Sequence, residues 1–181
     1  MGKKYITGYR AQTRTMALRY TVSVSILLLV IAVLQSSVFG KLRIFGAVPD
    51  LMICTVLIIA FFFGQYAGAI TGIGAGWLIE AIGGGTGILI LPVIYLLCGY
   101  LTGYLAKSAS ARRYPVYLIY LGIVLLLRAG TTVTYACLSY QYIDLPKILL
   151  QTVLPELIAT AICGSLLYAP LKVFCAALEK K

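Results

Sequence analysis

Two residues of opposite charge stand inside long apolar stretches of this chain: Arg128 and Glu156. Charged side chains in such surroundings are costly and mark functional or structural pairs. Arg128 lies about ten residues before the end of its stretch and Glu156 about eight residues into the next, so a helical rise of about 1.5 Å per residue puts them at similar depth. We therefore expect an intramembrane ion pair, with Glu80 as a competing carboxylate. The pair would either fix helix register or contact a ligand or partner.

The other acidic residues point to the same end of the expected bundle. Asp50 follows Pro49 at the start of an apolar stretch, and Glu80 lies near the end of another. With Arg128 and Glu156 they concentrate polar character in the outer half. This distribution suits an outward-open solute pocket or a docking surface for an extracytoplasmic partner. Asp50 is also a suitable helix N-cap.

Enzyme chemistry finds little support in the residue types. The chain has no histidine and no GxxxxGK[ST] phosphate loop, and the glycine-rich run 83–87 contains no lysine. We identify no nucleophile beside a base. The five cysteines form no CxxC pair and are expected to be buried apolar residues. We expect a noncatalytic protein without a metal or cofactor.

The elements that must position these residues are membrane helices. The chain is 61% hydrophobic and 11% charged, whereas soluble domains are about 25% charged. Since a span needs about 20 apolar residues, the sequence predicts an all-α integral membrane protein with one domain, residues 1–181. The six predicted transmembrane helices are about 18–39, 50–63, 66–82, 88–106, 114–138 and 148–174.

Basic residues set the expected orientation. They concentrate in the N-terminal segment, the 107–113 loop and the C-terminal tail, whereas the opposite loops hold only Lys41, Arg43 and Lys147. Cytoplasmic loops are enriched in Lys and Arg. We therefore expect a polar cytoplasmic tail over residues 1–17 and both termini in the cytoplasm. Anionic lipids, not nucleic acid, are the expected partners of the net charge of +10.

Small residues and tyrosines mark further helix faces. Gly68, Gly72 and Gly76 recur every four residues, which gives one helix a smooth face for close packing within the chain or against another protein. Ala32 and Ser36 form a weaker small-residue pair. A third face carries tyrosines that we expect to lie at the membrane interface: Tyr114, Tyr117 and Tyr120.

A series of short motifs runs from Leu34 to Tyr104. They are Leu34-Gln35-Ser36, Phe45-Gly46-Ala47-Val48-Pro49-Asp50-Leu51, the glycine-rich run from Gly68 to Glu80, the turn Gly83-Gly84-Gly85-Thr86-Gly87, and Tyr95, Gly99 and Tyr100. With these motifs the stretch resembles the MreD family of bacterial rod shape-determining membrane proteins. Glu80 stands where that family commonly has Asp.

The resemblance implies a membrane scaffold of the elongation machinery (the elongasome), which determines cell shape by linking cytoskeletal filaments to peptidoglycan synthesis. Its implied partners are MreC and, indirectly, MreB filaments, a glycan polymerase and a penicillin-binding transpeptidase, in the bacterial cytoplasmic membrane. The positions expected to bind partners or pack helices are Pro49, Asp50, Gly68, Gly72, Gly76 and Glu80.

The family fold is similar to the six-helix substrate-binding subunit of energy-coupling-factor transporters, which supplies an alternative function: binding a vitamin from the outer side. Against this alternative, the loop after the first span is short and has no aromatic cluster for a vitamin ring. The outer polar residues are also few for a tight small-molecule site.

Overall fold

The computed structural model describes residues 2–39, 48–83, 90–108, 114–139 and 149–179. Within these ranges the chain is all-α. Its α-helices are α1 (Gly2–Leu34), α2 (Leu51–Phe63), α3 (Gln65–Gly83), α4 (Ile90–Ser108), α5 (Tyr114–Ser139) and α7 (Leu154–Glu179). Two π-helical turns adjoin them, Gln35–Phe39 after α1 and Leu149–Val153 before α7.

The predicted helices match the described ones in place and order, with one difference at the start. Residues 2–17, expected as a polar tail, are the first part of α1. Gly83, the first residue of the turn predicted at 83–87, is the last residue of α3. The rest of that turn and the basic residues Lys41, Arg43 and Lys147 lie outside the described residues.

Among the described residues, three helices are long and apolar enough to cross a membrane. The qualifying segments are Leu18–Ser37, Tyr114–Thr131 and Leu154–Leu178. Their outward side chains are apolar: Leu18, Leu126, Leu166 and Val173 are each at least 65% exposed. So much exposed apolar surface is unusual for a soluble monomer and indicates a membrane protein.

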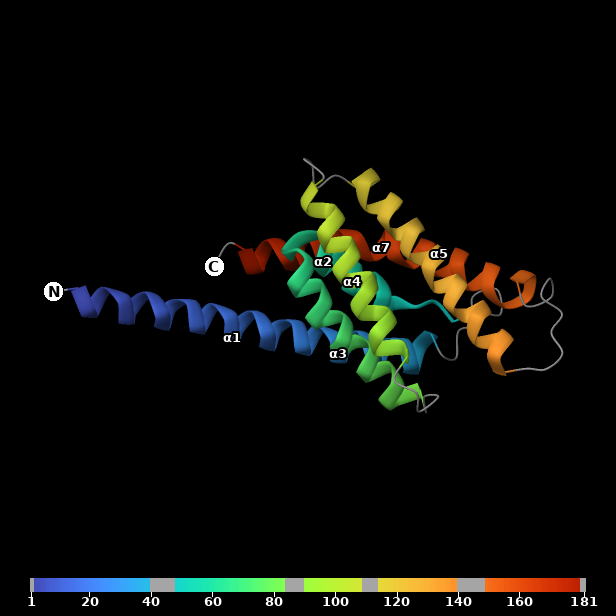
Figure 1. Ribbon diagram of the computed structural model, residues 1–181, viewed down its shortest axis with the longest axis horizontal. Coiled ribbons are helices and arrows are strands. Elements are labelled where there is room, and N and C mark those ends of the chain that lie inside the picture. Colours follow the sequence, from blue (N-terminus) through green and yellow to red (C-terminus); the bar gives the residue numbers. More distant parts are fainter. Residues whose placement is uncertain (1, 40–47, 84–89, 109–113, 140–148, 180–181) are drawn as a thin grey trace.

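Successive helices run in alternating directions, and both chain ends lie at the same end of the molecule (Figure 1). α3 and α4 pack closely as an antiparallel pair. α1 packs against α3 and α2, and α7 packs against α2 and α5. The long first helix continues past the other helices toward the N-terminus (Figure 1).

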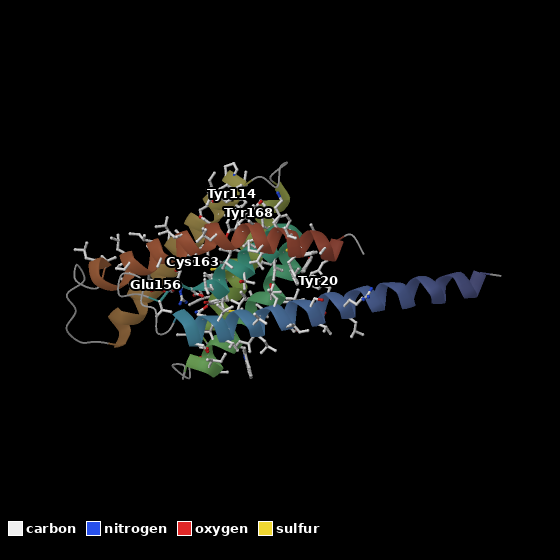
Figure 2. All side chains as sticks on the ribbon, turned by 180° about the vertical axis from the view of Figure 1, so that it is seen from behind. Tyr20, Tyr114, Glu156, Cys163 and Tyr168 are labelled. Carbon is white, nitrogen blue, oxygen red and sulfur yellow. The ribbon has the colours of Figure 1, made fainter. Side chains whose placement is uncertain are left out.

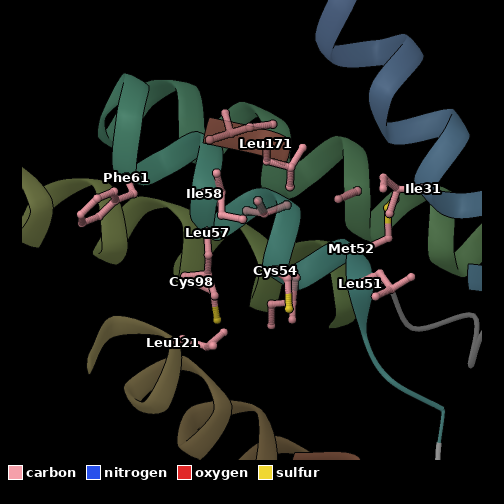
Figure 3. Packing of buried hydrophobic residues seen from close by; sticks show 14 of the residues in the cluster. Ile31, Leu51, Met52, Cys54, Leu57, Ile58, Phe61, Cys98, Leu121 and Leu171 are labelled. Atoms are coloured by element: carbon pink, nitrogen blue, oxygen red, sulfur yellow. The ribbon is translucent and has the colours of Figure 1, made fainter. Parts of the chain in front are cut away.

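The centre of the bundle is α2. Its residues from Leu51 to Phe62 are all buried, as expected for a helix that is apolar on every side. Figure 3 shows α2 packed among side chains of its neighbours, including Ile31 of α1, Cys98 of α4, Leu121 of α5 and Leu171 of α7. At about 1.5 Å per residue, its 13 residues cover only about 20 Å.

A single residue joins α2 to α3. Gly64 has φ 89°, in the left-handed region where glycine alone is free of strain. Its N–H donates to Ala60 O at 2.8 Å, and its own carbonyl accepts from Gly68 N at 3.0 Å. The chain can therefore reverse direction with almost no loop, which keeps α3 close to α2.

Candidate functional site

The N-terminus of α2 is a buried polar centre. Asp50 is the N-cap: its Oδ1 accepts from Ile53 N–H at 3.2 Å. Its own N–H donates to Thr160 Oγ1 of α7 at 3.1 Å, and its Oδ2 accepts from the Tyr95 hydroxyl of α4. With its side chain only 5% exposed, Asp50 joins α2 to α4 and α7.

Arg128 of α5 supplies the positive charge at this centre. Its Nη2 lies 3.2 Å from Asp50 Oδ2 and 3.8 Å from Glu156 Oε1. Its guanidinium carbon also lies 5.7 Å from the centre of the Tyr95 ring, within cation–π range. Because a charge in an apolar interior is costly unless paired, these contacts are what allow Arg128 to lie here.

The first π-helical turn adds a fifth helix to the centre. Gln35 Oε1 accepts from Met52 N–H at 3.1 Å and so satisfies a second free amide at the start of α2. Single π-helical turns are often found at functional positions. We call this cluster the Asp50 hub, made of Gln35, Asp50, Tyr95, Arg128, Glu156 and Thr160.

The structure brings together three of the charged residues singled out in the sequence. Arg128 and Glu156 are within ion-pair distance, but Asp50 is the nearer carboxylate. Glu80 lies near the C-terminal end of α3, and its competition for Arg128 stays a prediction. Figure 2 shows Glu156 near the start of α7, well separated along that helix from Tyr168.

Sequence reasoning did not assign the neutral members of the hub. Tyr95, Thr160 and Gln35 each contact Asp50 or the first turn of α2. Two of them, Gln35 and Tyr95, belong to the residues that carry the family resemblance, which was the available signal. Thr160 has no such signal, because one threonine in an apolar helix is usually bonded to its own backbone.

The glycine face of α3 packs within the chain. A Cβ on Gly72 would lie 2.3 Å from Tyr95 O, and one on Gly68 would lie 2.5 Å from Gly99 O. A Cβ on Gly76 would lie 2.4 Å from Pro92 Cα. α4 therefore covers this face, and the alternative in which it binds another protein is wrong.

Two residues of the other predicted helix faces, Tyr117 and Ala32, are also internal. Tyr117 is fully buried, its hydroxyl donates to Gly164 O at 3.1 Å, and its ring lies 4.8 Å from that of Tyr168. The interfacial assignment is therefore wrong for Tyr117. Ala32 is 4% exposed whereas Ser36 is exposed, so the two do not form one outward face.

Comparison of the chain with protein families, curated proteins and solved structures found no match. Among the described residues, no three His, Cys, Asp or Glu side chains gather to hold a metal ion.

The hub nevertheless has two clear physical properties. It ties five helices together at one point, and its Arg128 and Glu156 side chains keep some exposure, 18% and 22%.

The two carboxylates of the hub should differ in importance. We expect Glu156→Gln to lower the free energy of unfolding by less than about 1 kcal/mol, because the contact is long and partly exposed. Thermal unfolding in detergent measures the change, with Ser165→Ala on the same helix as the control. A loss as large as that of an Asp50 variant would contradict the ranking of the two carboxylates.

Proposed function

We propose that all six helices cross the bacterial cytoplasmic membrane, with both termini in the cytoplasm. Alternating helix directions and chain ends at one end of the molecule support this arrangement. The excess of basic residues at that end supports the orientation. In this arrangement α2 is a short span enclosed by its neighbours, so lipid does not need to match its length.

Within this membrane we propose a noncatalytic scaffold of the elongation machinery, of the MreD type, with MreC as its direct partner. MreB filaments, a glycan polymerase and a penicillin-binding transpeptidase are the indirect partners. One observation carries the proposal: residues of the resemblance, including Gln35, Asp50, Tyr95 and the glycines of α3, form the internal frame of the bundle. These residues hold the helices in fixed positions. A scaffold benefits from this rigidity, since rigid docking surfaces lose least entropy on binding.

The carboxylate of Asp50 is already occupied by contacts within the chain, which supports a scaffold over a vitamin-binding subunit. The Asp50 side chain already receives a backbone N–H, the Tyr95 hydroxyl and the Arg128 guanidinium from its own chain. A solute site needs polar groups that remain free to fix the orientation of its ligand. At Asp50, that capacity is used to hold helices together.

Gentle detergent extraction of a C-terminally tagged chain from its native host tests the proposal. We expect MreC and cell-wall synthases to co-purify, and depletion of the chain to convert rods into wide or round cells. Gly74→Ala is a suitable tagged control because its added methyl group meets only Leu28 Cδ1, at 3.7 Å. Recovery of an ATPase pair with a coupling membrane subunit, and normal rods on depletion, would overturn the scaffold.

A further inference from the structure

The N-terminal part of α1 extends beyond the rest of the bundle. The helix begins at Gly2, whereas the candidate span within it begins at Leu18. Positions 2–17, which we call the arm, lengthen the helix by about 24 Å at 1.5 Å per residue. Figure 1 shows the first turns of the arm reaching past the C-terminal end of α7, with no other described helix beside them.

The charge of the arm has one sign and falls mainly on one side. The arm contains Lys3, Lys4, Arg10 and Arg14 and no acidic residue. At 100° per residue, positions 3, 10 and 14 fall within an arc of about 40°. Position 4 is the exception, about 100° away. Three basic positions therefore form a stripe along the helix.

The opposite side of the arm has a different composition. Positions 5, 9 and 16 fall within another arc of about 40° and hold Tyr5, Tyr9 and Met16. This segregation is not needed to set membrane orientation, because the bias that sets it depends on the number of Lys and Arg residues and not on their helix face. It is what a surface for an extended anionic partner requires.

Anionic lipid accounts for only part of the stripe. Position 14 is about 6 Å from the start of the span, a distance similar to the thickness of one headgroup layer. Position 3 is about 22 Å away, which places it about two Debye lengths beyond the headgroups at physiological salt. Lipid charge is screened at that distance, so lipid headgroups do not account for the distal end of the stripe.

We propose that the arm docks through Lys3, Arg10 and Arg14 on an acidic face of a cytoplasmic protein. The cytoplasmic location rests on the orientation given under the proposed function. Exposed charge pairs contribute at most about 1 kcal/mol each, so the contact is reversible and weakens as salt rises. A contact of this kind gives the scaffold a second attachment point, outside the membrane and separate from the bundle.

Binding of a defined acidic probe tests the charge chemistry. The full chain in phosphatidylcholine nanodiscs is titrated with a fluorescent polyglutamate peptide. We expect Lys3→Gln, Arg10→Gln and Arg14→Gln together to weaken binding about tenfold, equivalent to about 0.5 kcal/mol per charge. The matched control removes three charges elsewhere on the same predicted side, through Lys107→Gln, Arg112→Gln and Arg113→Gln, and should retain binding. Equal loss in the two triple variants would overturn the proposal.

Photo-crosslinking in cells tests the occupant. A photoreactive residue at position 7 lies beside the stripe, and one at position 12 lies on the opposite side. We expect a protein adduct from position 7 only, lost in the arm variant, kept in the loop variant, and mapping to an acidic segment. Lipid adducts alone, or equal protein adducts from both positions, would refute a docking stripe.

Different outcomes would overturn the proposed membrane topology and the proposed contact of the arm. Nanodiscs expose both sides of the membrane, so the peptide titration does not depend on orientation. A reporter fused to the N-terminus reads orientation separately. A periplasmic N-terminus would overturn the proposed topology and the cytoplasmic partner together, whereas a cytoplasmic N-terminus without position-7 adducts would overturn the arm alone.

Discussion

Gly72→Ala should lower the thermal unfolding temperature by about 10 °C, equivalent to about 3 kcal/mol for a chain of this size. The added Cβ would lie 2.3 Å from Tyr95 O and 2.7 Å from Tyr95 C. Both are backbone atoms, so no side-chain rotation can relieve the clash and α3 must move away from α4. The movement also displaces Tyr95, whose hydroxyl donates to Asp50.

A glycine two residues further along α3 provides the control. A Cβ on Gly74 meets only Leu28 Cδ1, at 3.7 Å, which is an ordinary contact. Gly74→Ala should therefore be neutral or stabilising by up to about 1 kcal/mol, because alanine favours a helix over glycine. A thiol-reactive fluorophore reports unfolding, since Cys54 and Cys98 are buried. Equal unfolding temperatures for the two variants would contradict the close packing of α3 on α4.

The positions of the helices could be predicted from the sequence, because hydropathy determines where membrane helices can be. α2 was predicted at 50–63 and is found at Leu51–Phe63, and α5 was predicted at 114–138 and is found at Tyr114–Ser139. Which helix packs against each face was harder to predict. The spacing of Gly68, Gly72 and Gly76 identified a close-packing surface but could not say which helix covers it.

The signal for that partner was nevertheless present. Gly99 and Gly103 repeat the four-residue spacing on α4, and a Cβ at either position would lie within 2.5 Å of the α3 chain or its first turn. Two glycine faces on helices that are consecutive in the sequence indicate a pair that packs backbone to backbone. Sequence reasoning considered one of the two faces only.

The contact between Asp50 and Arg128 was not predicted. The depth comparison was made for Arg128 and Glu156, and Asp50 was placed only in the same outer half. α2 has only 13 residues, about 20 Å, so it is shorter than a hydrocarbon core about 30 Å thick. Its N-terminus lies inside the bundle, where the Asp50 carboxylate meets Arg128 at 3.2 Å.

The largest effect in the hub should follow loss of the cation. Arg128→Met leaves Asp50 and Glu156 without their shared guanidinium, and Asp50 is almost fully buried. Removing one partner of a buried ion pair costs about 3–5 kcal/mol. Unfolding measured by cysteine accessibility should show this loss, and Arg19→Met, at an exposed position of α1, should show almost none.

Asp50→Asn separates the charge of this residue from its role as a cap. Asparagine caps a helix as well as aspartate does, so the hydrogen bond from Ile53 N–H can persist while the charge is lost. Arg128 would lose its nearer carboxylate and keep its contact with Glu156, at 3.8 Å. We expect a loss of about 1–3 kcal/mol, smaller than for Arg128→Met.

The double variant Asp50→Asn with Arg128→Met decides whether charge pairing explains both losses. With both charges removed, no unpaired buried charge remains at Asp50, so the double variant should be more stable than Arg128→Met alone. The expected coupling is about 2 kcal/mol, within the range for residues in contact. If the two losses simply added, the substitutions would act through packing around α2, and the ion pair would contribute nothing to holding α5 against the hub.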